Sequence, residues 1–198
     1  MTENRRKQWL LVTLTTGSSS TLRVHAWRRL RSLGALYLQN SVSLLPARPE
    51  TSKAVAHLVD HVRRGGGEAR VLRITLADAG EEAAVVAEFS AERRDEYNEV
   101  CSRVPAFLEE ITMERGRGRA TYTEVEESEA DLDRLRKWLG RVQARDYFGA
   151  PGRAEAEAAF ERCAVELAEF EAEALAAELP AEVVPNSETR PKRLRAVE

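Results

Sequence analysis

Cysteine, histidine and aromatic residues are scarce in this sequence, and it has no long apolar run. The 198 residues include 2 cysteines and 3 histidines, and aromatic side chains make up 6% of the chain. Cys101 and Cys163 cannot form a disulfide framework, and they lack the spacing of metal ligands. No apolar run approaches the roughly 20 residues that a membrane span needs, and no signal-peptide pattern is present. We therefore expect a soluble, cytoplasmic protein with no metal, no cofactor and no membrane contact.

Charged residues are plentiful but unevenly distributed. They make up 32% of the chain, and the formal net charge is -3. Residues 1–80 carry 13 Lys/Arg against 5 Asp/Glu, whereas residues 81–198 carry 17 against 28. A basic first half can bind phosphates, oxyanions or an acidic partner. The acidic second half of the same chain is one such partner.

Hydrophobic periodicity divides the first half into short strands and helices. Alternating, β-branched segments predict strands at residues 8–15, 35–39, 42–45 and 69–76, and helical spacing predicts helices at 22–33 and 50–64. Gly34 and the glycines at 65–67 are typical helix stops. The order β-α-β-β-α-β is that of a ferredoxin-like domain, with two helices on one face of an antiparallel sheet. We assign this domain to residues 8–78.

From residue 81 onward the pattern is helical. It predicts helices at residues 81–104, 107–114, 129–147 and 154–179, with a break at Pro105 and an N-cap at Ser128. We expect this helical region, residues 81–179, to pack on the open face of the sheet. Residues 180–198, with three prolines, are expected to form a disordered tail. The predicted fold class is α+β, a ferredoxin-like domain followed by an all-helical C-terminal half.

The predicted helix at 22–33 and the turn before it carry the first candidate site. Arginines crowd this helix beside Trp27, and a run of hydroxyl side chains precedes it. Arginine forks fit phosphates and tetrahedral oxyanions, and the N–H groups at a helix start bind anions. The alternative is a solvated helix face paired with acidic residues of the second half. The candidate anion- or nucleic-acid-binding residues are Ser18, Ser19, Ser20, Thr21, Arg23, Arg28, Arg29 and Arg31.

Two similar clusters of charged and aromatic residues form the second candidate site. They are RRDEY at residues 93–97 and RDYF at residues 145–148. If their helices pack, arginine–carboxylate pairs can tie the helices together or shape a polar pocket with the tyrosine hydroxyls. We favour a structural network and assign no catalytic residue. The pocket residues are Arg93, Asp95, Glu96, Tyr97, Arg145 and Asp146.

Several segments of the chain resemble the N-terminal domain of chromate resistance protein B (ChrB). They are WLLV at 9–12, RVHAWRRL at 23–30, LGA at 33–35, SVSLLP at 41–46, GGGEA at 65–69, FSAERRDEY at 89–97 and WLGRVQARD at 138–146. The resemblance covers roughly residues 8–175. It implies a role in bacterial chromate resistance, and some members of this family are taken to be chromate-responsive transcriptional regulators.

A fainter resemblance links the first half to PaaX-type repressors and to small CRISPR-associated ferredoxin-like nucleases. Those nucleases carry an acidic residue at the end of the first strand, where this chain has Thr15 and Thr16. Nuclease activity is therefore not implied. We expect a non-enzymatic, oxyanion-responsive regulator, with chromate or another oxyanion, DNA and a second copy of the chain as partners. The alternative is a nucleic-acid-processing or other enzyme that uses the pocket residues of the second candidate site.

Overall fold

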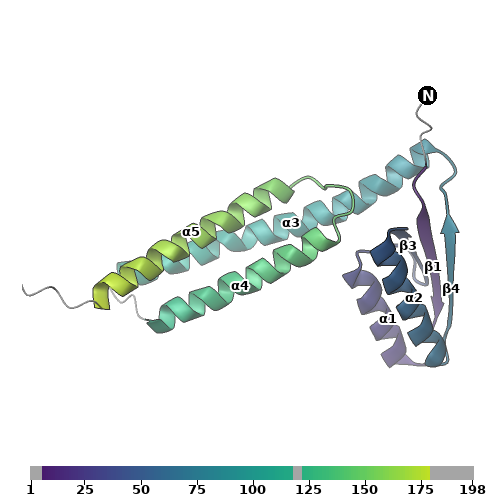
Figure 1. The fold of residues 1–198 in the computed structure, drawn as a ribbon, viewed down its shortest axis with the longest axis horizontal. Helices are drawn as coiled ribbons and strands as arrows, with labels where there is room; N and C mark the ends of the chain where they lie inside the picture. The colour runs from purple at the N-terminus through teal and green to yellow at the C-terminus, as the bar shows by residue number, and fades with distance from the viewer. Residues whose placement is uncertain (1–5, 118–121, 179–198) are drawn as a thin grey trace, which may run out of the picture.

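Four strands and two helices form an antiparallel α/β unit at one end of the molecule (Figure 1). The computed structural model describes residues 6–117 and 122–178. The elements of this unit are β1 (Trp9–Thr15), α1 (Ser20–Ser32), β2 (Leu36–Gln39), β3 (Val42–Pro46), α2 (Pro49–Arg64) and β4 (Glu68–Ile74). The strand order is β2-β3-β1-β4, and every pair is antiparallel. The predicted β-α-β-β-α-β order and the α+β class are confirmed.

Helices α1 and α2 cover one face of the sheet. Helix α1 buries Leu22, Ala26 and Leu30, which recur every four residues and so lie on one side of the helix. Leu10 and Val12 of β1 face these side chains, because alternate residues of a strand point to the same face. The apolar contact fixes α1 against the sheet and leaves its opposite side in solvent.

The other face of the sheet is covered in part by a helix of the second half. This helix, α3 (Ala79–Gly116), places Phe89 with its ring centroid 5.7 Å from that of Trp9. The ring of Phe148 lies 5.8 Å from Trp9 as well. Farther along the same face Leu72 remains 52% exposed. The expected packing of the helical region on the sheet is therefore confined to the start of α3 and the segment around Phe148.

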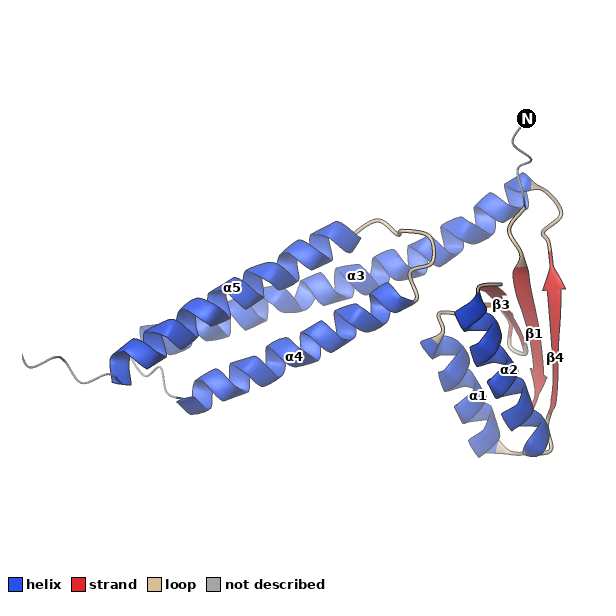
Figure 2. Ribbon diagram, in the orientation of Figure 1, coloured by secondary structure: helices blue, strands red, loops and turns tan. Residues whose placement is uncertain are grey.

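The rest of α3 packs with α4 (Tyr122–Ala144) and α5 (Arg153–Glu178) in a three-helix bundle that extends away from the sheet (Figure 2). Its core is separate from that of the α/β unit, and it combines apolar stripes from all three helices. Members of this core include Val100, Val104, Phe107, Ile111, Leu132, Leu135, Leu139, Val142, Cys163, Leu167 and Phe170. In the described parts of the chain, no helix is long and apolar enough to cross a membrane.

Two predicted helix limits are wrong. Helix α3 continues through Pro105, because Val104 and Phe107 on either side of it are both buried in the bundle core. The proline ring itself lies on the exposed side of the helix. Ser128 does not cap α4 but is buried in its second turn, since Val125 extends the apolar stripe and the helix begins at Tyr122.

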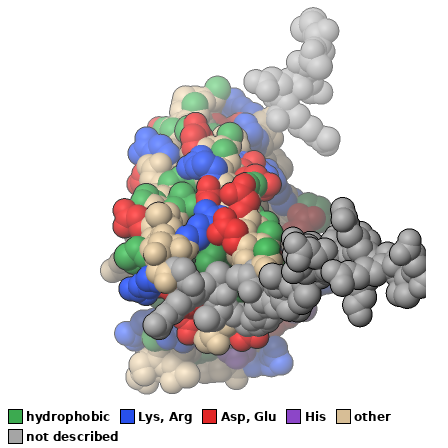
Figure 3. All heavy atoms as spheres, turned by 90° about the vertical axis from the view of Figure 1, so that its left-hand side faces the viewer, with side chains coloured by type: hydrophobic (Ala, Val, Ile, Leu, Met, Phe, Trp, Pro, Cys, Tyr) green, Lys and Arg blue, Asp and Glu red, His purple; other side chains and the backbone are tan. Residues whose placement is uncertain are grey.

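Ion pairs join two helices of the bundle. Arg115 of α3 forms ion pairs with Glu166 and Glu173 of α5, at 2.7 and 3.1 Å. Figure 3, which looks onto the free end of the bundle, shows acidic and basic side chains intermixed on that surface. The predicted domain boundary, between residues 78 and 81, falls at the start of α3. The predicted tail at 180–198 lies outside the described residues.

Candidate functional site

The hydroxyl residues of the first candidate site lie at the start of α1. Ser19 is the N-cap, and its Oγ accepts a hydrogen bond of 3.3 Å from the backbone N–H of Leu22. Ser18, Ser20 and Thr21 are exposed. This arrangement is the ordinary capping geometry of a helix start, and it leaves the three neighbouring hydroxyls open to solvent.

The four candidate arginines of α1 are exposed and keep their charge unpaired. Within the described residues, none of Arg23, Arg28, Arg29 and Arg31 has a carboxylate partner within ion-pair distance. Arg23 donates from Nη2 to the carbonyl of Gly17 at 3.1 Å. The guanidinium of Arg31 lies 5.2 Å from the ring centroid of Trp27. The expected alternative, neutralisation of this face by the acidic half, is not seen in these parts of the chain.

A groove of about 740 Å³ runs between α1 and the β2–β3 hairpin. Arg23, Trp27 and Tyr37 line it, together with the hydroxyl and amide residues of the adjoining turns. A second pocket of about 360 Å³ lies on the other side of the two aromatic residues and is lined by Arg31 and Arg93. The sequence did not predict this groove. Arg23 and Trp27, four residues apart on one face of α1, mark its helix wall, but no sequence signal places the hairpin opposite them.

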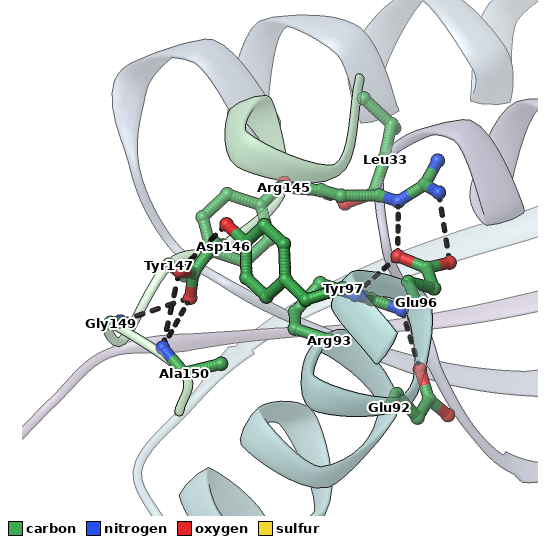
Figure 4. Close-up of polar contacts among 10 residues, drawn as sticks. All are labelled: Leu33, Glu92, Arg93, Glu96, Tyr97, Arg145, Asp146, Tyr147, Gly149 and Ala150. Atoms are coloured by element: carbon green, nitrogen blue, oxygen red, sulfur yellow. Dashed lines mark hydrogen bonds and ion pairs between the residues drawn. The ribbon is translucent and has the colours of Figure 1, made fainter. Parts of the chain in front are cut away.

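The second candidate site is a polar network between α3 and the end of α4 (Figure 4). Arg145 donates to Glu96 with Nε at 3.1 Å and Nη2 at 2.8 Å, which is a two-pronged pair. The same carboxylate lies 2.9 Å from Nε of Arg93, a side chain that is only 6% exposed. Arg93 also pairs with Glu92 at 3.0 Å. Glu96 thus holds the two arginines of the network together.

Tyr97 and Asp146 form the other half of this network. The Tyr97 hydroxyl donates to Oδ2 of Asp146 at 3.2 Å. Oδ1 of the same carboxylate accepts from the backbone N–H groups of Gly149 and Ala150, both at 2.9 Å. Burial, and then the nearby Asp146 charge, raise the pKa of Tyr97 to about 12. The tyrosine is therefore a fixed hydrogen-bond donor at neutral pH.

Asp95 does not join the network, although the sequence placed it there. Its side chain is 70% exposed and pairs only with the neighbouring Arg94 among the described residues. Asp95 lines the smaller pocket beside Arg93 and Glu96, but its carboxylate pairs with Arg94 and not with Arg93. Glu92, which the sequence did not single out, pairs with Arg93 instead. Burial raises the pKa of the Glu92 carboxyl, against the opposing effect of Arg93.

Tyr147 ties the network to the end of α1. Its hydroxyl donates to the carbonyl of Leu33 at 2.6 Å, and Arg48 of the α/β unit donates to the Tyr147 carbonyl. Arg48 also lies 5.1 Å from the centroid of the Tyr147 ring. The sequence includes Tyr147 in its second charged and aromatic cluster, but no pattern in it points to Arg48 or Leu33. The charged groups of α3 and of the end of α4 bind one another within the helical half, and Tyr147 joins that half to the α/β unit, as in a structural network.

A comparison with protein families identifies the family of the chain. The family model described as Protein ChrB, N-terminal, matches residues 23–180. That range begins in α1, and it includes the exposed arginines of α1, the polar network and the helical bundle. No curated protein matches the chain.

Proposed function

The chain belongs to the ChrB N-terminal family, which makes it a chromate-resistance-related protein, and from this premise we propose that it is an oxyanion-responsive regulator. The observation that carries the proposal is the set of exposed arginines on α1. Arg23, Arg28, Arg29 and Arg31 are exposed, and none has a carboxylate partner in the described ranges. Unpaired guanidinium groups bind tetrahedral oxyanions through parallel N–H donors.

The far end of α1 supports a regulatory role. Leu33, directly after this helix, accepts the hydrogen bond from Tyr147, and Gly34 packs against Arg93 and Arg145. An anion held by Arg28 and Arg31 would therefore lie within two turns of the contact between the halves. Such a regulator would act in the cytoplasm without a resident cofactor, with DNA and a second copy of the chain as its expected partners.

The chemistry of the response in this proposal is reversible binding. Chromate is a tetrahedral dianion, and the N–H groups of exposed guanidinium side chains suit that shape and charge. Cys163 is buried, and burial raises the pKa of its thiol, which disfavours the reactive thiolate. Cys101 is half-buried in the bundle, away from α1. Oxidation of either cysteine is therefore not part of the proposal.

A thermal unfolding experiment tests this proposal. Chromate at about 100 times its Kd should stabilise the protein by about 2.7 kcal/mol, roughly 5 °C or more in Tm, and sulfate should compete. The double variant Arg28→Ala, Arg31→Ala should lose the shift, whereas Cys101→Ser, Cys163→Ser should keep it. If the cysteine variant loses the response and the arginine variant keeps it, the chemistry is redox and the proposal is wrong.

A further inference from the structure

The groove between α1 and the β2–β3 hairpin has dimensions that an oxyanion does not explain. Its volume of about 740 Å³ lies within the roughly 300–1,000 Å³ range of small-molecule sites. A tetrahedral oxyanion has only five heavy atoms and would occupy a small part of that space. The groove therefore fits a ligand larger than the oxyanion of the proposed function. Arg28 and Arg29 of the same helix do not line it.

The lining of the groove is chemically divided. One part is apolar and aromatic, with Val24, Trp27 and Tyr37. Arg23 supplies a positive charge, and no aspartate or glutamate is among the lining residues. Threonine, serine and asparagine side chains complete the wall, at Thr15, Thr16, Asn40, Ser41 and Ser43. A complementary ligand has a flat aromatic part, polar edges and a negative charge.

The aromatic part of the groove is held in place. Trp27 is 47% exposed, yet Arg31 lies over its ring at 5.2 Å, and Arg31 lines only the smaller pocket on that side. The Tyr37 hydroxyl donates to the carbonyl of Trp27 at 3.3 Å, which fixes the tyrosine across the groove. An exposed indole that is already oriented loses little conformational freedom when a planar ring stacks on it.

We propose that this groove binds a free mononucleotide, with the base against Trp27 and the phosphate at Arg23. Base stacking on an aromatic side chain tolerates any base, and the hydroxyl and amide side chains of the wall can bind its edges. Arg23 donates one hydrogen bond from Nη2 to the carbonyl of Gly17, which orients its guanidinium group. The other N–H groups of the guanidinium are available to a phosphate. A single arginine in a bounded groove suits one phosphate group rather than a continuous strand.

Calorimetric titration of the full chain with the four common nucleoside monophosphates tests this proposal. We expect saturable binding of at least one of them, and binding of its nucleoside or of inorganic phosphate that is about 10-fold weaker or worse. Trp27→Leu and Arg23→Gln should each weaken binding about 10-fold or more, whereas Trp27→Phe should retain most of it. The matched control is Arg70→Gln, an exposed arginine of β4 that lines neither pocket and should bind as the wild type does.

Three results would overturn the proposal. The first is no binding of any mononucleotide at millimolar concentration by a protein whose circular dichroism and melting curve are normal. The second is unchanged binding by folded Trp27→Leu and Arg23→Gln variants. The third is binding of a short oligothymidylate without any binding of mononucleotides, which would make the groove a strand site. The oxyanion response is measured separately at Arg28 and Arg31, so either proposal can fail alone.

Discussion

Gly34 lies where the chain leaves α1 and touches α3. Its φ of 65° is in the left-handed region, which glycine adopts without strain. A Cβ at this position would lie 2.7 Å from Nη1 of Arg93 and 2.9 Å from Cβ of Arg145. Two independent features therefore require glycine at this position: the left-handed backbone conformation, and the close packing of two arginines.

Replacing Gly34 with alanine should lower the free energy of unfolding by about 2–4 kcal/mol. Backbone strain and the clash with Arg93 act together, and Arg93 is too buried to move into solvent. Urea unfolding measures the change. Gly140→Ala is the matched control, since an added Cβ meets nothing within 4 Å there and should stabilise α4 by about 0.5–1 kcal/mol. A neutral Gly34→Ala would mean that the contact with α3 is looser than described.

At the scale of the element, α3 is the exceptional helix. It runs for 38 residues with Pro105 inside it, so the carbonyl of Cys101 lacks its usual N–H donor. Buried side chains on both sides of the proline belong to one core, and their packing holds the helix continuous. Tertiary contacts here override a local signal that normally ends a helix.

Pro105→Ala should raise the free energy of unfolding by about 1–3 kcal/mol, because it restores one backbone hydrogen bond in an exposed position. Chemical denaturation followed by far-UV circular dichroism measures this. The control Ser102→Ala lies one turn earlier on the same exposed side and should change stability by about 0.5 kcal/mol or less. Destabilisation by Pro105→Ala would show that the bundle needs the bend that proline introduces.

The elements that the sequence predicted well are those set by local pattern. The strands and the helices of the α/β unit alternate with clear changes of period, and glycines mark their ends, so their order could be predicted correctly. The start of α4 and the continuity of α3 could not, because Ser128 and Pro105 carry strong local signals that packing overrides. Only the three-dimensional core shows that Val125 is buried.

The same distinction applies to the candidate sites. Two clusters of similar composition predicted a joined network, and Arg93, Glu96 and Arg145 do meet. The sequence could not separate Asp95 from Glu92, because the two lie one turn apart on the same side of α3 and only the packed structure shows which of them pairs with Arg93. The groove was beyond reach for a similar reason, since its walls come from a helix and a hairpin that meet only after folding.

At the scale of the whole molecule, a third apolar cluster lies between two separate cores. The core under α1 and α2 and the core of the bundle have no residue in common. Trp9 and Leu44 of the sheet pack with Val85 and Phe89 of α3 in the third cluster. On the same helix, Glu96 pairs with both Arg93 and Arg145. Apolar packing therefore holds α3 on the sheet, and the charged network fixes the end of α4 on α3.

Glu96→Ala should destabilise the protein by about 2–4 kcal/mol, because it leaves two arginines partly buried with one carboxylate fewer. Differential scanning calorimetry measures the loss as a lower Tm. The neighbouring variant Asp95→Ala removes only an exposed pair and should change stability by about 0.5 kcal/mol or less. Equal effects of the two variants would show that the network contributes no more to stability than an exposed ion pair does.

The unbroken length of α3 also has a mechanical meaning. From Arg93 at the contact to Gly116 at its end, the helix extends about 35 Å, at roughly 1.5 Å per residue. A rod of that length acts as a lever arm, so a tilt of about 10° at the contact sweeps the distant tip through about 6 Å. Helices α4 and α5 pack along α3 in a shared core, so they move together with it. A small change in the angle of α3 beside α1 therefore displaces the whole bundle.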